Sequence, residues 1–244
     1  MAQPATRRWP RLGRPAPLPV TPPAIAAKQA FLREHRIFAG LSSREQIWLN
    51  TSTTMVRYPQ GRAFYHPNDR GEVIFILKEG RTNLYRMTPD GRKLVTAQLQ
   101  PGTVFGEMAL FGQGMYGCHA EAATDCLICV LGRGELVGLI QRDPVVALNL
   151  LEDLGQRLQT CESQLEAFAF GNVTSRLASF LLSEADAFGT VLGLSHQEIG
   201  ERLGIYRETV SQTLGRFRQQ GIIAVETRHI RLLDPDRLAV LARA

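Results

Sequence analysis

The sequence lacks the features that would place it among membrane proteins or several familiar enzyme classes. No uninterrupted apolar stretch approaches the roughly 20 residues needed to cross a bilayer. Arg7 and Arg8 are followed by prolines and not by the apolar core of a secretory signal. The spacings of a serine-hydrolase elbow, a phosphate-binding P-loop and a zinc protease are absent, and the five histidines are scattered. We therefore expect a cytoplasmic protein that is not an enzyme.

Cysteine is scarce, which limits the cofactors that the chain can hold. All four cysteines lie at position 118 or later, so there is no N-terminal group of thiolates for an iron–sulfur cluster. Cys126 and Cys129 are three apart on an expected strand, which points them to opposite faces and argues against a shared metal. The pair Cys118-His119 is too little to predict haem. We expect no metal and no cofactor.

Acidic residues are missing from the first segment of the chain. Residues 1–28 hold five basic residues, no acidic residue and seven of the thirteen prolines. This segment accounts for the whole formal charge of +5, because 23 basic and 23 acidic residues remain after it. We predict a disordered basic tail, since proline removes backbone donors and little apolar surface is present to offset the ordering entropy.

Short runs rich in β-branched and aromatic residues occupy residues 54–130, with glycine or proline between them. Thr88-Pro89-Asp90-Gly91 is a strong hairpin turn. This pattern predicts an antiparallel jelly roll or barrel. Residues 25–48 are expected to form a helical cover before it.

A long helix is expected to begin at Pro144. Its apolar residues alternate spacings of three and four, which is the pattern of a coiled-coil seam. The same stripe on a helix that covers its own barrel would be ordinary core. We favour a dimer interface and a parallel homodimer. The predicted interface residues are Leu151, Leu154, Leu158, Cys161, Leu165 and Phe168. Cys161 would face its symmetry mate, either as a reduced thiol or as a cross-chain disulfide.

A second domain follows a break at Phe170-Gly171-Asn172. Ser195 and Glu198 form the S-x-x-E capping box that starts a helix, and Gly204 suits the left-handed position that ends one. In the next helix Val210, Leu214 and Phe217 recur at helical spacing, as buried residues do. Its opposite face presents polar residues near its N-terminus, which is where a helix-turn-helix reads base edges. A helical hairpin whose polar face only meets water is the alternative.

The residues after Gly221 favour the DNA-reading interpretation. Two apolar runs separated by residues 226–229 predict a two-stranded wing beside the helices. Arg207 can donate to guanine and Glu208 can accept from cytosine, whereas Ser211 and Gln212 serve several bases or a phosphate. We therefore predict an α+β protein in four parts: a disordered tail (1–28), a β jelly roll (29–143), a dimerisation helix and hinge (144–171), and a winged helix-turn-helix (172–244).

With these elements the chain resembles the CRP/FNR family of bacterial transcription regulators, over nearly everything after the tail. The resemblance rests on RETVSQ (207–212), FGEMALFG (105–112) and NVTSRLASFLL, which starts at Asn172. It implies that the jelly roll is an effector-binding, cyclic-nucleotide-binding-like domain, followed by a central dimerising helix and a DNA-binding winged helix. His196 and Gln197 occupy the family's phosphate-contacting start of the first helix. Gln212 stands where members usually carry Arg, and glutamine favours adenine or a neutral phosphate contact.

The resemblance also implies candidates for an effector pocket. In cyclic-AMP-responsive relatives an Arg-Ser pair holds the cyclic phosphate, and matching the cassette puts Gly117 and Cys118 in those places. Without the arginine, the binding free energy for the cyclic phosphate is weaker by about 1.5–3 kcal/mol, which is roughly ten- to a hundredfold in affinity. Cys161 and Glu162 replace an adenine-facing Thr-Ser pair, and Glu107 remains as the ribose-contacting acid. The pocket candidates are Gly106, Glu107, Met108, Gly117, Cys118, Cys161 and Glu162.

These observations predict a homodimeric, sequence-specific transcription regulator that does not respond to cyclic AMP and acts either without a ligand or with another effector. Its partners would be double-stranded DNA at a pseudo-palindromic site and RNA polymerase, with no membrane. The predicted DNA-binding residues are Arg207, Glu208, Thr209, Ser211, Gln212, His196 and Gln197. Two alternatives stay open, namely a redox or haem sensor, and a ligand-sensing module that acts through protein partners.

Overall fold

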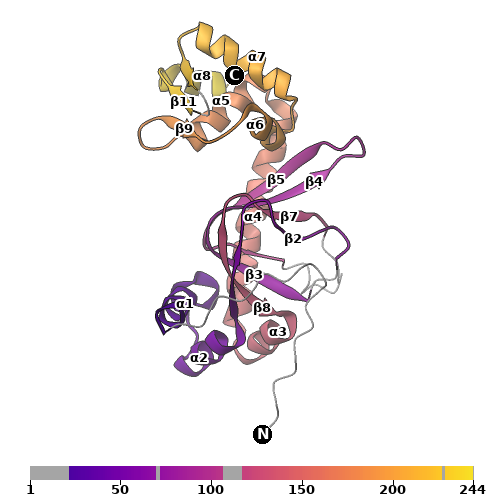
Figure 1. Cartoon of the computed structure of the whole chain (residues 1–244), viewed down its shortest axis with the longest axis vertical. Coiled ribbons are helices and arrows are strands. Elements are labelled where there is room, and N and C mark those ends of the chain that lie inside the picture. The colour runs from indigo at the N-terminus through magenta and orange to yellow at the C-terminus, as the bar shows by residue number, and fades with distance from the viewer. Residues whose placement is uncertain (1–21, 70–71, 107–116, 227–228, 244) are drawn as a thin grey trace. The chain divides into compact units, whose positions relative to one another are not determined.

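The computed structural model describes residues 22–69, 72–106, 117–226 and 229–243 (Figure 1). The chain separates into two compact units. One contains the residues up to Arg86 together with Thr96–Gly155, and the other contains Met87–Val95 together with Gln156–Ala244. No helix among the described residues is both long enough and apolar enough to cross a membrane.

The first helix begins inside the segment that was expected to be disordered. Helix α1 spans Pro22–Glu34, so the prediction of a disordered tail is wrong for residues 22–28. Proline suits the first turn of a helix, because the N–H that it lacks would have no intrahelical partner there. The ammonium of Lys28 also donates to the carbonyls of Asn50 and Thr53, at 2.5 and 3.1 Å. Residues 1–21 lie outside the described residues.

The N-terminal unit contains two four-stranded sheets, and every strand pairing given for them is antiparallel. In order across the sheets, one holds β1 (Thr54–Tyr58), β8 (Cys126–Gly132), β3 (Val73–Glu79) and β6 (Val104–Phe105), and the other holds β2 (Ala63–Tyr65), β7 (His119–Ala122), β4 (Thr82–Met87) and β5 (Lys93–Leu99). Side chains from both sheets share one apolar cluster, including Phe75, Leu84 and Ile128. The jelly-roll prediction is confirmed.

Strand β8 is buried on both faces, which explains its unbroken apolar sequence. Cys126, Ile128 and Val130 belong to the cluster between the sheets, whereas Cys129 and Leu131 belong to a second cluster under the helices. The two cysteines therefore face opposite ways, as the period of a strand predicts.

Helices cover the outer face of the β1–β8–β3–β6 sheet. The cover consists of α1, the 3-10 helix η1 (Arg36–Phe38), α2 (Ser43–Ser52), α3 (Arg133–Arg142) and the start of α4 (Val145–Phe170). Helices α1 and α2 were expected from the sequence. Helix α3 was not, and Gly132 at its N-cap provides no side-chain hydrogen bond that would have signalled its start.

One face of α4 is fixed to this cover. Val146 and Leu150 are buried in the helical cluster. The side-chain amide of Asn149 donates to the carbonyls of Arg36 and Ile37, both at 3.1 Å. Asp153 is 3% exposed and pairs with the guanidinium of Arg36. The start of α4 is thus held by apolar contacts and by polar ones.

The C-terminal unit is a winged helix-turn-helix (Figure 1). Asn172 caps α5, and its side chain accepts from the backbone N–H of Ser175 at 2.9 Å, which confirms the predicted cap. The elements are α5 (Val173–Glu184), β9 (Thr190–Leu192), α6 (His196–Leu203), α7 (Arg207–Gln219), β10 (Ile223–Glu226), β11 (His229–Leu232) and α8 (Pro235–Ala242). The wing has a third strand, β9, which the sequence did not reveal, and α8 was also missed.

Candidate nucleic-acid interface and effector pocket

The turn between α6 and α7 is built by local signals. Ser195 and Glu198 satisfy each other's backbone donors, at 3.2 Å to the Ser195 hydroxyl and 2.8 Å to the Glu198 carboxylate. Gly204 ends α6 with φ +62° and ψ +35°, the left-handed conformation that glycine adopts freely. A Cβ on Gly200 would stand 2.8 Å from the carbonyl oxygen of Ile205, so only glycine lets the chain pass this closely.

Helix α7 has one buried face. Val210, Leu214 and Phe217 are each at most 2% exposed and join Ile199 of α6 in the core of the unit. The spacing of four and three residues places them on a single stripe. This stripe fixes the rotation of α7 about its axis, so that its other face points to solvent.

The predicted reading residues lie on that outer face and at its edge. Arg207, Glu208, Gln212 and Gln197 are exposed, whereas Thr209, Ser211 and His196 are half-buried. The side chains of His196 and Ser211 hydrogen-bond at 2.8 Å, and the Gln197 amide donates to Glu201 at 3.0 Å. The helical period thus predicted which side of α7 faces solvent, but it did not predict the contact between His196 and Ser211.

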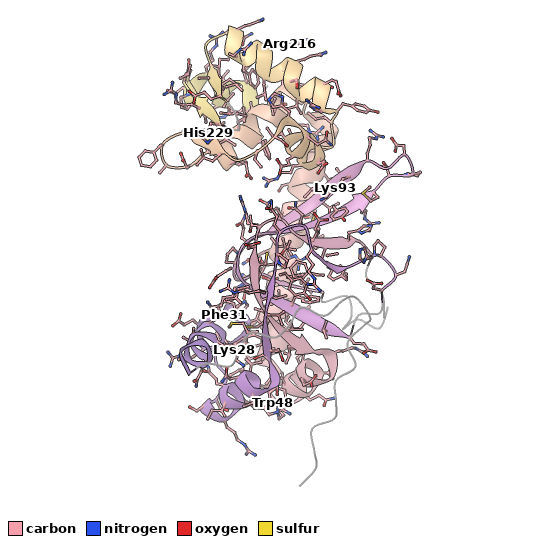
Figure 2. All side chains as sticks on the ribbon, viewed as in Figure 1. Lys28, Phe31, Trp48, Lys93, Arg216 and His229 are labelled. Atoms are coloured by element: carbon pink, nitrogen blue, oxygen red, sulfur yellow. The ribbon has the colours of Figure 1, made fainter. Side chains whose placement is uncertain are left out.

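Two exposed cations on α7 were not among the predicted site residues. Arg216 and Arg218 stand in the last turn, and Figure 2 shows Arg216 on the helix. Cations at a helix C-terminus interact favourably with the macrodipole. Arg202 of α6 is different, because it pairs with Glu184 at 2.7 Å and its side chain is only 11% exposed. The alternation in GRFRQQ was the available signal for the two α7 arginines.

The predicted dimer seam on α4 is exposed on the single chain. Leu151, Leu158 and Leu165 are 59%, 60% and 67% exposed. Leu154 is half-buried, Cys161 is exposed, and the side chain of Phe168 lies outside the described residues. Leu148, at 63%, adds a further apolar residue that the prediction omitted. Large apolar side chains at this spacing mark a surface that a partner helix can cover.

The candidate effector residues of the β domain are only partly described. Gly106 follows β6 with φ +85°, while Glu107 and Met108 lie outside the described residues. A Cβ on Gly117 would stand 3.8 Å from a guanidinium nitrogen of Arg86, at the end of β4. Cys118 is half-buried and packs against the core between the sheets. Position 117 therefore offers no side chain, and position 118 offers a thiol.

The remaining pocket candidates, Cys161 and Glu162, are exposed residues of α4 in the C-terminal unit. Their place in an effector pocket stays a prediction.

Burial favours the protonated form of two cysteine thiols, Cys126 and Cys129. Burial raises the pKa of the Cys129 thiol to about 12, although nearby Lys28 and Lys78 favour the thiolate. Burial also raises the pKa of Cys126, whose thiol donates to the carbonyls of Arg81 and Thr124 and contacts the Thr82 hydroxyl. Both thiols stay protonated near neutral pH, and the thiolate is the reactive form. Among the described residues no group of three or more potential ligands is placed to hold a metal ion.

An antiparallel jelly roll followed by a winged helix-turn-helix is the architecture of a class of DNA-binding transcription regulators. The comparisons agree. Residues 55–143 match the family model of the cyclic nucleotide-binding domain. Residues 175–241 match the family model of the Crp-like helix-turn-helix domain. The chain is 32% identical to the cyclic AMP receptor protein of Thermus thermophilus over 205 residues, which cover 81% of this chain and 94% of that protein.

Two further relatives extend the picture. The global nitrogen regulator of Synechococcus elongatus is 33% identical over 196 residues, covering 75% of this chain and 87% of that protein. A crystal structure of a CRP/FNR family transcriptional regulator from Thermus thermophilus superposes with a TM-score of 0.66 at 28% identity, covering 78% and 98%. The chain therefore belongs to the CRP/FNR family of transcription regulators.

Proposed function

We propose that this protein is a homodimeric regulator that reads a pseudo-palindromic DNA site with α7. The observation that carries the proposal is the division of α7 into a buried apolar face and an outer face that presents Arg207, Glu208 and Gln212 at its N-terminal end. Arg207 would donate to guanine, Glu208 would accept from cytosine N4, and Gln212 would contact adenine or a phosphate. Thr209, Ser211, His196 and Gln197 would position the helix.

The exposed stripe on α4 supports the dimer. A parallel pair of such helices would cover the leucines and set two reading helices about one turn of DNA apart. The half-sites would then be related by a two-fold axis, which is the reason for a pseudo-palindrome. We also propose RNA polymerase as a partner, because the family regulates transcription, and we assign no surface to this contact.

We also propose that cyclic AMP is not the effector. Gly117 supplies no guanidinium and Cys118 supplies a thiol, half-buried against the core, in place of the phosphate-holding pair. Family membership leaves the effector open, since one relative is named a cyclic AMP receptor protein and another a global nitrogen regulator. The protein would act without a ligand or with a different one, and no haem or iron–sulfur cluster is included.

Redox control is a second candidate, favoured by the exposure of Cys161 on the same helix as the leucine stripe. In a parallel dimer the two copies of this thiol would face each other. Oxidation would then link the two helices, provided that the sulfurs meet at disulfide geometry. The cheap sign is a dimer band on a non-reducing gel that disappears in the Cys161→Ser variant.

The proposal is tested by measuring DNA affinity of the reduced protein on a selected palindromic library, with and without cyclic AMP, at fixed physiological salt. We expect tight, selective binding that cyclic AMP leaves unchanged. Arg207→Ala should lose most of it, whereas Arg237→Ala, an exposed arginine on α8, should bind like the wild type. Binding that appears only with cyclic AMP would overturn the effector proposal. No selective binding under either condition would overturn the function.

A further inference from the structure

A hydrogen bond joins the two helices of the helix-turn-helix directly at the reading face. His196 is the first residue of α6, and Ser211 lies one turn into α7. The imidazole Nδ1 and the serine Oγ are 2.8 Å apart, across 15 positions of sequence, and both residues are half-buried. The close approach of the chain at Gly200 brings the start of α7 against α6.

This bond is unusual for a helical hydroxyl. Serine and threonine inside a helix commonly donate to the carbonyl four residues earlier, and Thr213 does so, with 2.8 Å to the Thr209 oxygen. The hydroxyl of Ser211 instead meets a side chain on another helix. A serine hydroxyl has one proton and two lone pairs, so the partner of the proton decides what the hydroxyl offers to DNA.

We propose that His196 acts on DNA recognition through Ser211, as a positioning residue for the reading helix. This inference rests on the proposed function. The Nδ1 atom accepts the Ser211 proton, and the ring keeps its one N–H on Nε2. The serine oxygen then presents only lone pairs to the groove, and it accepts from a base amino group, adenine N6 or cytosine N4.

The opposite direction of this hydrogen bond, with Nδ1 as the donor, suits a DNA complex less well. If Nδ1 donated to Ser211, the neutral imidazole would turn an acceptor, Nε2, toward the phosphate backbone, which offers acceptors only. With Nδ1 as acceptor, every polar atom of the pair has a complementary partner when DNA is bound. The charged groups on the elements that carry the pair are Glu198, Glu201 and Arg202 on α6, and Arg207, Glu208, Arg216 and Arg218 on α7.

A double-mutant cycle on DNA affinity tests the coupling. His196→Ala and Ser211→Ala should each weaken binding by about tenfold, and the double variant should lose little more than either alone, because both remove the same contact. Gln197→Ala is the matched control, since this neighbour bonds to Glu201 within α6. Its loss should be additive with that of Ser211→Ala. Additive losses for His196 and Ser211 would overturn the proposal.

Two conservative variants separate positioning from direct phosphate contact. The amide of asparagine can replace Nδ1, whereas that of glutamine reaches toward the place of Nε2. We expect His196→Asn to retain affinity within about threefold and His196→Gln to bind like His196→Ala. Rescue by glutamine alone, with a changed salt slope, would mean that the ring serves the backbone directly and would overturn the proposal.

Base preference tests the polarity. His196→Ala and Ser211→Ala should lose selectivity at the same position of each half-site, for adenine or cytosine on the contacted strand. A shared preference for guanine or thymine would overturn the assignment. Thermal unfolding midpoints of the variants should match the wild type. If the wild type binds selectively and Arg207→Ala weakens this binding, but the coupling between His196 and Ser211 is absent, only this inference fails. If the wild type binds no DNA, both proposals fail.

Discussion

Helices α4 and α7 are both amphipathic, but only α7 completes its packing within one chain. The apolar stripe of α7, Val210, Leu214 and Phe217, is buried against its own unit, and its polar face is exposed. Helix α4 buries Val146 and Leu150 and leaves a second stripe, with Leu158 and others, in solvent. An exposed polar face suits recognition of a charged ligand, whereas an exposed apolar stripe suits burial against another apolar surface, for which we propose a second copy of the helix.

The largest effect is expected from a charge placed in the exposed apolar stripe of α4. Leu158→Glu should weaken the dimer by roughly 3–6 kcal/mol, because two leucine side chains per dimer lose their burial and two charges enter the seam. Sedimentation equilibrium would measure the dissociation constant. Gln159→Glu, an exposed neighbour beside the stripe, is the control and should remain dimeric. An unaltered dimer in Leu158→Glu would contradict the assigned seam.

The next largest effect is expected from truncating a buried side chain of α7. Phe217→Ala should lower the free energy of unfolding by about 3–5 kcal/mol, because a fully buried ring leaves a cavity. Urea unfolding followed by circular dichroism would measure it. Val240→Ala, on a 67% exposed residue of α8, should change the value by less than about 0.5 kcal/mol. A loss below about 1 kcal/mol for Phe217→Ala would show that α7 does not pack as described.

Acid should loosen the cover that anchors α4. His35 is 6% exposed, its Nδ1 accepts from the backbone of Ile37, and its Nε2 is buried with no hydrogen-bond partner among the described residues. Burial lowers its pKa to about 4 from the ordinary 6.5, and Arg36 lowers it further against a backbone contact to Gly102. Between about pH 6.5 and 4, His35 is protonated in the unfolded chain and neutral in the folded chain. Stability is therefore lost between about pH 6.5 and 4, by up to about 3 kcal/mol.

The measurement is the urea midpoint as a function of pH, with the fluorescence of Trp48 on α2 as a reporter of the N-terminal unit. Carboxylates also titrate in this range, so the wild type is compared with His35→Asn. The difference in unfolding free energy between the two proteins should change across the window. A constant difference would mean that His35 is protonated alike in both states.

Arg207→Ala has the smallest expected effect per site. It tests whether the exposed face of α7 reads bases. It should cost about 1–3 kcal/mol at each half-site and relax selectivity there, because a bidentate contact to guanine is lost. Fluorescence anisotropy on the selected site and on single-base variants would measure both. Arg218→Ala should weaken binding to all sequences equally. Retained selectivity in Arg207→Ala would assign base reading to another residue.

Helix ends that carry a local sequence signal, such as a capping residue or a glycine, were predicted nearly to the residue. The capping box of Ser195 and Glu198, the left-handed Gly204 and the cap at Asn172 all stand where the sequence placed them. The missed elements lack such signals. Strand β7 reads HAEA, with no β-branched residue, and it forms because it pairs with β2 and β4. Helix α3 follows β8 without a side-chain cap.

For the site, the sequence determined which face of α7 is buried and which polar residues stand opposite, because the helical period relates residues three and four apart. It also determined that Gly117 and Cys118 carry neither guanidinium nor hydroxyl. Only the tertiary structure decided that Val146 and Leu150 form the inner face of α4, and that His196 meets Ser211. Both depend on contacts between residues far apart in the chain, which neither periodicity nor capping encodes.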